Sequence, residues 1–341
     1  MKLSRLTFFS ALLAAASLTA AEPKIETVLE GLVNPCGVAI QPETGLVFVS
    51  DSGLGKVIRV VDGKAQDAIT GSLKDVYGKG PKYEIGPLGI AFFDKATLVV
   101  GDGGFVDGEE FVRVFTLPEA GGEALDYDKD AKTKAGPLPA TDDLKPEGNF
   151  YGLAVSKTAV YITSNGDDTK GWVHRLPIEG TKFGKLERWL ATKEAVEVDA
   201  PVAITMSPRN EVVVGQMGEV NKPNDSLLTF YSASTGKMLM NLETNLHDIT
   251  GLAYHPKSGL LYATDFAWME AAEGGLYRID RGAKDGDSAV KVVKIAALEK
   301  PTAMAFAADG TLYVTTIGAP GAEETAAKTG KLVKITLPTN P

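Results

Sequence analysis

A short pattern of residues occurs six times along the chain. Each copy begins with a small residue followed by apolar ones, and after a gap it continues as a strand of β-branched residues that ends at a polar side chain. The small residues, which we call anchors, are Gly37, Gly89, Gly152, Ala203, Gly251 and Ala303. They lie 52, 63, 51, 48 and 52 residues apart, a period that holds four short strands and their turns. The pattern therefore predicts an all-β chain, a six-bladed β-propeller.

Each copy continues into a third apolar strand. These strands are expected at 57–60, 112–115, 172–176, 227–231, 275–279 and 331–335. Small anchors suit the innermost strands, which converge at the axis and leave little room for large side chains.

The two ends of the chain complement each other. The last copy ends after its third strand, near Leu337, and lacks an outer strand. The apolar segment 25–29 precedes the first copy at nearly the same spacing as 290–295 precedes the last copy. We therefore expect the N-terminal strand to join the last blade and close the ring, leaving no open sheet edge there.

The first 21 residues have the features of a signal peptide. Lys2 and Arg5 precede an apolar run of 16 residues, 6–21, which is shorter than the roughly 20 residues that span a bilayer. Thr19 and Ala21 fit the small-x-small rule for cleavage. The expected mature chain is a single propeller domain, 22–341, exported to the periplasm or the medium, and no later segment is apolar enough to cross a membrane.

Charge and cysteine content narrow the possible functions. The 341 residues carry a net charge of −9, and the mature chain would hold 33 basic and 44 acidic residues, a net charge of −11. This argues against a nucleic-acid partner, whose phosphates require a basic surface. The single Cys excludes a disulfide framework and Cys-clustered metal sites.

Two short motifs carry a family resemblance. Starts of the form Pro-x-Gly/Ala-apolar-Ala, as in Pro35-Cys36-Gly37-Val38-Ala39, and strand ends of the form Val-x-Asp, as in Val49-Ser50-Asp51, carry it over nearly the whole mature chain. The sequence thereby resembles the NHL-repeat and SMP-30-like six-bladed propellers, also described as TolB-like. That group includes lactonases, sugar oxidoreductases, lyases and binding scaffolds, so the resemblance implies a fold and not one activity. It also implies that the residues just before each anchor share one face, the loop face, with the loops that follow each second strand.

The resemblance raises the question of a metal site. A calcium-dependent lactonase of the SMP-30 kind would place Asn and Asp directly before the anchors. Here those positions hold Cys36, Leu88, Tyr151, Val202, Thr250 and Thr302. Asn34, Asn149 and Asp248 stand two positions earlier. Asn149 and Asp248 are the candidate ligands of a calcium ion, although such residues also cap turns.

Other polar motifs favour structural roles. The residues that end the second strands recur in every blade, so we expect them to satisfy backbone donors in the turns that follow. The segment 126–130 matches the start of an EF-hand loop and then departs from it, which predicts a solvated loop within the insertion 118–148. Cys36 and His247 lack a third partner for nucleophilic catalysis, and Cys36 is interpreted as a buried thiol.

The loop face carries the remaining candidates. The loops between second and third strands hold twelve acidic and four basic side chains, a net charge of −8, and one of them contains Phe266, Trp268 and Met269. This combination predicts binding of a small molecule or a protein there. The candidate ligand-binding residues are Asn149, Tyr151, His247, Asp248, Asp265, Phe266, Trp268 and Glu270.

The sequence leaves open whether the chain is an enzyme, and it favours an exported propeller that binds a ligand without chemistry. The alternative is a metal-dependent, lactonase- or esterase-like hydrolase of the gluconolactonase type, or a sugar oxidoreductase.

Overall fold

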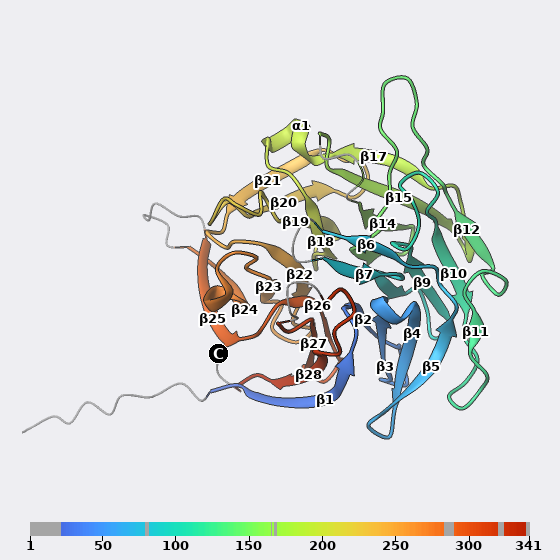
Figure 1. The fold of residues 1–341 in the computed structure, drawn as a ribbon. Helices are drawn as coiled ribbons and strands as arrows, with labels where there is room; N and C mark the ends of the chain where they lie inside the picture. Colours follow the sequence, from blue (N-terminus) through green and yellow to red (C-terminus); the bar gives the residue numbers. More distant parts are fainter. Residues whose placement is uncertain are drawn as a thin grey trace, which may run out of the picture.

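Six β-sheets of four or five strands surround a central axis (Figure 1). The computed structural model describes residues 22–78, 82–164, 166, 169–282, 290–319 and 324–338. In this part of the chain each blade contains one copy of the repeat, and the strands run in order from the axis outward. The predicted six-bladed β-propeller is confirmed.

The blades follow one another along the chain. Blade 1 consists of β2 (Pro35–Ile40), β3 (Val47–Asp51), β4 (Lys56–Val61) and β5 (Lys64–Thr70). Blade 2 consists of β8 (Ile90–Phe92), β9 (Thr97–Gly101), β10 (Val112–Thr116) and β12 (Thr133–Ala135). Blade 3 consists of β13 (Leu153–Val155), β14 (Ala159–Thr163), β15 (Trp172–Glu179) and β17 (Glu187–Ala191), with the short β16 (Lys182–Phe183).

The second half of the ring is more regular. Blade 4 consists of β18 (Pro201–Met206), β19 (Glu211–Gln216), β20 (Leu227–Ser232) and β21 (Met238–Glu243). Blade 5 consists of β22 (Ile249–Tyr254), β23 (Leu261–Asp265), β24 (Gly275–Arg281) and β25 (Val290–Ala297). Blade 6 consists of β26 (Pro301–Phe306), β27 (Leu312–Thr316), β28 (Gly330–Thr336) and the N-terminal β1 (Lys24–Leu32).

The N-terminal strand closes the ring as predicted. β1 pairs antiparallel with β28, with Lys24 opposite Thr336 at one end and Leu32 opposite Gly330 at the other (Figure 1). The first described strand of the chain is thus the outer strand of the last blade, and the hydrogen bonds of one sheet tie the two ends together.

Close packing at the axis explains the small anchors. A Cβ atom added to Gly89 would lie 2.1 Å from the carbonyl oxygen of Tyr151, and one added to Gly37 would lie 2.5 Å from that of Leu88. Neighbouring inner strands therefore approach each other too closely for a side chain at these positions.

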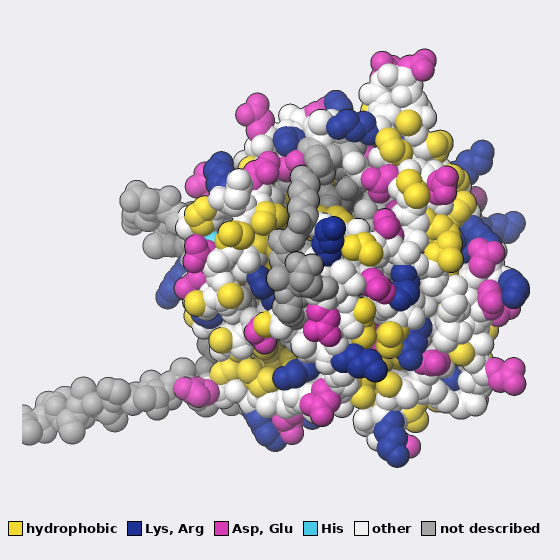
Figure 2. Space-filling model, in the orientation of Figure 1, with side chains coloured by type: hydrophobic (Ala, Val, Ile, Leu, Met, Phe, Trp, Pro, Cys, Tyr) yellow, Lys and Arg dark blue, Asp and Glu magenta, His cyan; other side chains and the backbone are white. Residues whose placement is uncertain are grey.

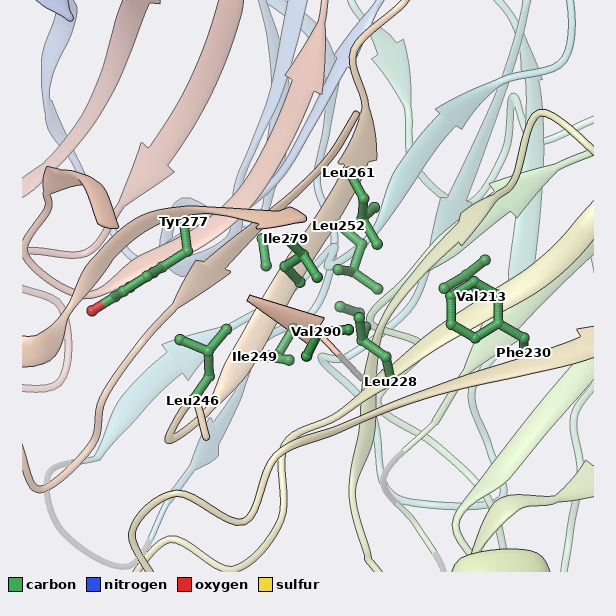
Figure 3. Packing of buried hydrophobic residues seen from close by; sticks show 12 residues of the cluster. Val213, Leu228, Phe230, Leu246, Ile249, Leu252, Leu261, Tyr277, Ile279 and Val290 are labelled. Atoms are coloured by element: carbon green, nitrogen blue, oxygen red, sulfur yellow. The ribbon is translucent and has the colours of Figure 1, made fainter. Parts of the chain in front are cut away.

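Apolar side chains fill the spaces between blades. Figure 3 shows the cluster between blades 4 and 5, in which Val213, Leu228 and Phe230 face Leu252 and Ile279. Comparable clusters occupy the other five blade boundaries in the described part of the chain. The second strand of each blade is buried on both faces, which is why strands such as β9, β14 and β19 are almost continuously apolar, whereas the outer strands β5 and β21 are largely exposed.

Several elements were not expected from the repeat. A hairpin of β6 (Asp75–Tyr77) and β7 (Tyr83–Ile85) connects blades 1 and 2, and a one-turn helix, α1 (Thr192–Val196), precedes blade 4. Two 3₁₀ turns, Ser52–Leu54 and Ala271–Glu273, follow second strands.

The insertion 118–148 is not simply a solvated loop, and that expectation is wrong in part. Its β12 completes blade 2, and its β11 (Leu125–Asp126) pairs in parallel with β5 of blade 1. The carboxylates of Asp126 and Asp128 are held by local hydrogen bonds and ion pairs with Lys129, Lys134 and Arg113.

None of the helices in the described ranges is long and apolar enough to cross a membrane. The expected signal peptide, 1–21, lies outside the described residues. Acidic and basic side chains are interspersed over the face of the molecule seen in Figure 2.

Candidate functional site

A cavity of about 100 Å³ lies on the axis of the ring, and we call it the axial cavity. The six residues directly before the anchors, one from each blade, all line it. They are Cys36, Leu88, Tyr151, Val202, Thr250 and Thr302. The sixfold repeat thus brings equivalent positions of six blades to one place, and the side chains found there are apolar or uncharged.

Loops and the β6–β7 hairpin build the walls of the axial cavity. Tyr77, Tyr83 and Ile85 come from the hairpin, and Phe266 and Trp268 come from the loop after β23. The remaining lining residues are Asn149, Pro201, Met217 and Ile317. None of the described residues that line this cavity is charged.

Tyr151 lines the cavity and reaches from blade 3 to blade 6. Its hydroxyl donates a hydrogen bond of 2.9 Å to the carbonyl oxygen of Thr302, which belongs to the opposite blade. A second, smaller cavity of about 70 Å³ lies among the inner strands and shares Cys36, Tyr151 and Thr250 with the axial cavity. Tyr151 therefore stands between the two spaces.

Contacts with neighbouring side chains hold the aromatic wall of the cavity, which consists of Tyr83, Phe266 and Trp268, in place. The rings of Phe266 and Trp268 lie 4.7 Å apart, and Tyr83 lies 5.8 Å from Trp268. The ammonium group of Lys300 lies 4.7 Å from the centre of the Phe266 ring and donates to the carbonyl oxygen of Trp268 at 2.8 Å. The carboxylate of Asp248 accepts the backbone N–H of Trp268 at 2.6 Å. These contacts fix the loop and its rings before any ligand binds.

Three other predicted residues share a separate space, which we call the peripheral cleft. His247, Asp248 and Glu270 line a cavity of about 220 Å³, together with the loop 220–223 and Met269. Burial raises the pKa of Asp248 to about 7, and the nearby Asp265 also raises it. The Asp248 carboxyl group can therefore exchange a proton near neutral pH.

The structure divides the predicted site residues between these two spaces. Asn149, Tyr151, Phe266 and Trp268 line the axial cavity, whereas His247, Asp248 and Glu270 line the peripheral cleft. Asp265 lines neither. It is completely buried, and its carboxylate accepts the backbone N–H groups of His247, Asp248 and Ala267.

The two candidate calcium ligands do not share one space. Asn149 lines the axial cavity, and its side-chain amide faces Asp107 at 3.4 Å, while Asp248 belongs to the peripheral cleft. Across the described ranges, no three His, Cys, Asp or Glu side chains are grouped as a metal would require. Cys36 and His247 are likewise in different spaces, and burial raises the pKa of the Cys36 thiol to about 12.

The strand-end carboxylates accept backbone N–H groups as expected, but not only in the turns that follow, because Asp51 and Asp265 also bind the segments that precede the inner strands of their blades. Asp51 accepts the N–H of Val33 at 2.7 Å, and Asp102 accepts that of Phe111 at 3.1 Å. Asp102 also binds the guanidinium of Arg113 at 2.9 Å. Asn165, another of these residues, lies outside the described residues.

The acidic charge counted on the loop face requires a correction. Glu110 and Asp265 are completely buried, and their carboxyl groups accept backbone N–H groups below the surface. Asp167, Asp168 and Glu323 lie outside the described residues. The count of −8 therefore includes groups that do not contribute to an exposed acidic surface.

The sequence reasoning missed Tyr77 and Tyr83. Their signal was the pair of short runs 75–77 and 83–85, separated by glycines, which is typical of a hairpin. A search for repeats does not detect such an insertion, because it occurs in one blade only.

No protein-family model matches the sequence, and no curated protein matches it. Many solved structures resemble the fold. A gluconolactonase from Xanthomonas campestris aligns with a TM-score of 0.58 and 15% identity, covering 93% of this chain and 90% of its own. The soluble aldose sugar dehydrogenase from Escherichia coli, in its apo-form, aligns with a TM-score of 0.57 and 13% identity. The alignment covers 92% of this chain and 99% of that protein. The PQQ-bound aldose sugar dehydrogenase from Streptomyces coelicolor aligns with a TM-score of 0.55 and 12% identity. The alignment covers 92% of this chain and 98% of that protein. These likenesses show a shared fold.

Proposed function

We propose that the protein binds a neutral, largely apolar small molecule in the axial cavity. The observation that carries this proposal is the lining of that cavity, which joins aromatic and aliphatic side chains and has no charged group among the residues that the structure describes. A charged ligand would lose its hydration there without gaining a partner of opposite charge. The axial cavity, about 100 Å³, is of the same order as an apolar cavity of about 150 Å³ that binds benzene, so it suits a ligand no larger than about one substituted aromatic ring.

The cofactors that the fold suggests do not fit the axial cavity. Calcium takes several oxygen ligands, commonly carboxylates, and the described lining residues include no Asp or Glu and a single amide side chain, that of Asn149. PQQ is a polyanionic quinone, and the lining positions in the described ranges include neither Lys nor Arg. No step of the proposed function uses either group.

Ethylbenzene is a suitable first probe of the axial cavity. We expect it to bind the wild type, and Trp268→Ala to weaken its binding roughly tenfold because an aromatic wall is lost. Met269→Ala is the matched control, since Met269 stands in the same loop with 71% of its side chain exposed. Kd values from calorimetry or NMR titration test this. Equal affinity of the Trp268→Ala variant and the wild type, or no binding to the wild type, would refute the proposal.

A second candidate function is hydrolysis of a lactone or ester, or oxidation of a sugar. The structural neighbours described as a gluconolactonase and as aldose sugar dehydrogenases support a catalytic function. The peripheral cleft supports it as well, because it groups His247 with Asp248 and Glu270. A carboxyl group with a pKa near 7 is suited to proton transfer at neutral pH.

Turnover assays separate the two candidates. If the cleft is catalytic, the wild type should hydrolyse gluconolactone or oxidise an aldose, and Asp248→Asn should lower kcat/KM by about 100-fold or more. Glu243→Gln, at an exposed position outside the cleft, controls for the loss of one carboxyl group. A wild type that acts on neither class of substrate would exclude this second function.

We also propose that the protein is exported and that it belongs to the SMP-30-like group of propellers. The apolar segment 6–21 supports export of a mature chain that begins at Glu22, and the shared fold supports the group. The loop face remains the proposed contact surface for a small molecule or a protein.

A further inference from the structure

Most polar side chains of the axial cavity already have partners within the protein. The hydroxyl groups of Thr250 and Thr302 donate to the carbonyl oxygens of Pro301 and Pro35, at 2.7 and 2.6 Å. The Cys36 thiol donates to the carbonyl oxygen of Asn34 at 3.2 Å. With the Tyr151–Thr302 bond described above, these groups have no need of a ligand.

Tyr83 differs from these residues. Its side chain lines the axial cavity and is only 4% exposed, and its hydroxyl oxygen is buried without a hydrogen-bond partner among the described residues. A buried hydroxyl group without a partner destabilises the folded protein, because the hydrogen bonds it made to water are lost and not replaced. The same residue contacts Trp268 in the aromatic wall, so its ring is part of the cavity surface.

The phenol of Tyr83 is a hydrogen-bond donor over the whole physiological pH range. Burial raises its pKa to about 12, and the neighbouring Cys36 is the second cause. Protonated phenol can donate one hydrogen bond and accept others. Because the lining residues are uncharged, its natural partner inside the cavity is an oxygen or nitrogen acceptor on the ligand.

We infer that the ligand of the axial cavity carries one uncharged hydrogen-bond acceptor, such as a carbonyl oxygen, and that the Tyr83 hydroxyl recognises it. This inference rests on the proposed function, because it assumes that the cavity binds a ligand. It narrows the ligand class from apolar molecules in general to small, neutral carbonyl compounds of aromatic or similar shape. Tyr83 thereby selects among ligands that fill the cavity equally well.

Two nearly isosteric probes test this inference. Acetophenone and ethylbenzene differ in shape by little and in hydrogen bonding by one carbonyl oxygen. We expect Tyr83→Phe to weaken acetophenone binding roughly 2- to 10-fold and to leave the Kd of ethylbenzene unchanged. Both Kd values are measured on the wild type and on the variant.

Tyr151→Phe is the matched control for stability without a ligand. It removes a hydroxyl from the same cavity, but one that has a partner in Thr302, so it should lower the Tm. Tyr83→Phe should leave the Tm unchanged or raise it, because the hydroxyl that it removes has no partner.

The outcomes separate the two levels of the proposal. If ethylbenzene binds and Tyr83→Phe leaves acetophenone binding unchanged, the role of Tyr83 is refuted and the apolar cavity stands. If Tyr83→Phe lowers the Tm as much as Tyr151→Phe, the hydroxyl is already bonded in the free protein, and the inference is also refuted. If neither probe binds the wild type, the proposed function itself fails.

Discussion

At the scale of single residues, Glu110 shows how the fold alters the chemistry of a carboxyl group. It is completely buried, and its carboxyl oxygens accept the backbone N–H groups of Asn149 and Phe105. Burial raises its pKa to about 9, and the negative charges of Asp102 and Asp107 contribute to the rise. The folded protein therefore holds a proton on Glu110 at neutral pH.

Glu110 should make the stability of the protein decrease with rising pH. The unfolded chain releases this proton near pH 4.3, whereas the folded chain keeps it until about pH 9, so the folded state binds more protons between these values. The free energy of unfolding then falls as pH rises through that window. Glu110→Gln has no proton to release, so the Tm of the variant minus that of the wild type should grow from pH 5 to pH 9.

Thermal unfolding at intervals of one pH unit measures this difference. Asp51 and Asp248, whose pKa values burial raises to about 6 and about 7, act in the same direction. They are present in both proteins, so the difference isolates Glu110. Glu109→Gln, at an exposed neighbouring position, controls for the removal of one carboxyl group. A Tm difference that stays constant from pH 5 to pH 9 would show that Glu110 is ionised in the folded state.

At the scale of secondary-structure elements, the sequence predicts what is repeated and misses what occurs once. All six inner strands and their anchors follow from the spacing, because every blade meets the same steric limit at the axis. The β6–β7 hairpin and the strand β11 occur in one place each. β11 pairs with a strand of another blade, a contact that no local pattern indicates.

The candidate site divides in the same way. The positions before the anchors could be identified from the repeat, and these residues do form the floor of the axial cavity. Spacing alone could not tell whether Asn149 and Asp248 converge. They occupy equivalent positions in the repeat, yet Asn149 lines the axial cavity and Asp248 lines the peripheral cleft. Tyr83 was missed because its importance comes from contacts with Trp268, far away in the sequence.

At the scale of the whole molecule, stability depends on completing the ring. Each blade packs on two neighbours, so an open boundary exposes the apolar faces of two blades. The boundary between blades 6 and 1 includes Leu32 of β1, which is 4% exposed, and the partly buried Val28 and Leu29. The chain is thus held together at the point where its two ends meet.

Deletion of residues 22–32 should therefore destabilise the entire propeller and not only blade 6. The deletion exposes the edge of β28 and removes the apolar side chains of β1 from their cluster, and we expect a loss of more than roughly 3 kcal/mol. Thermal unfolding and size-exclusion chromatography measure the loss of stability and any association through the exposed edge. A synthetic peptide of residues 22–32 should restore the Tm, because it can add the missing strand to β28, whereas a scrambled peptide should not. A truncated protein that remains monomeric and melts at the wild-type temperature would show that the ring does not need its N-terminal strand.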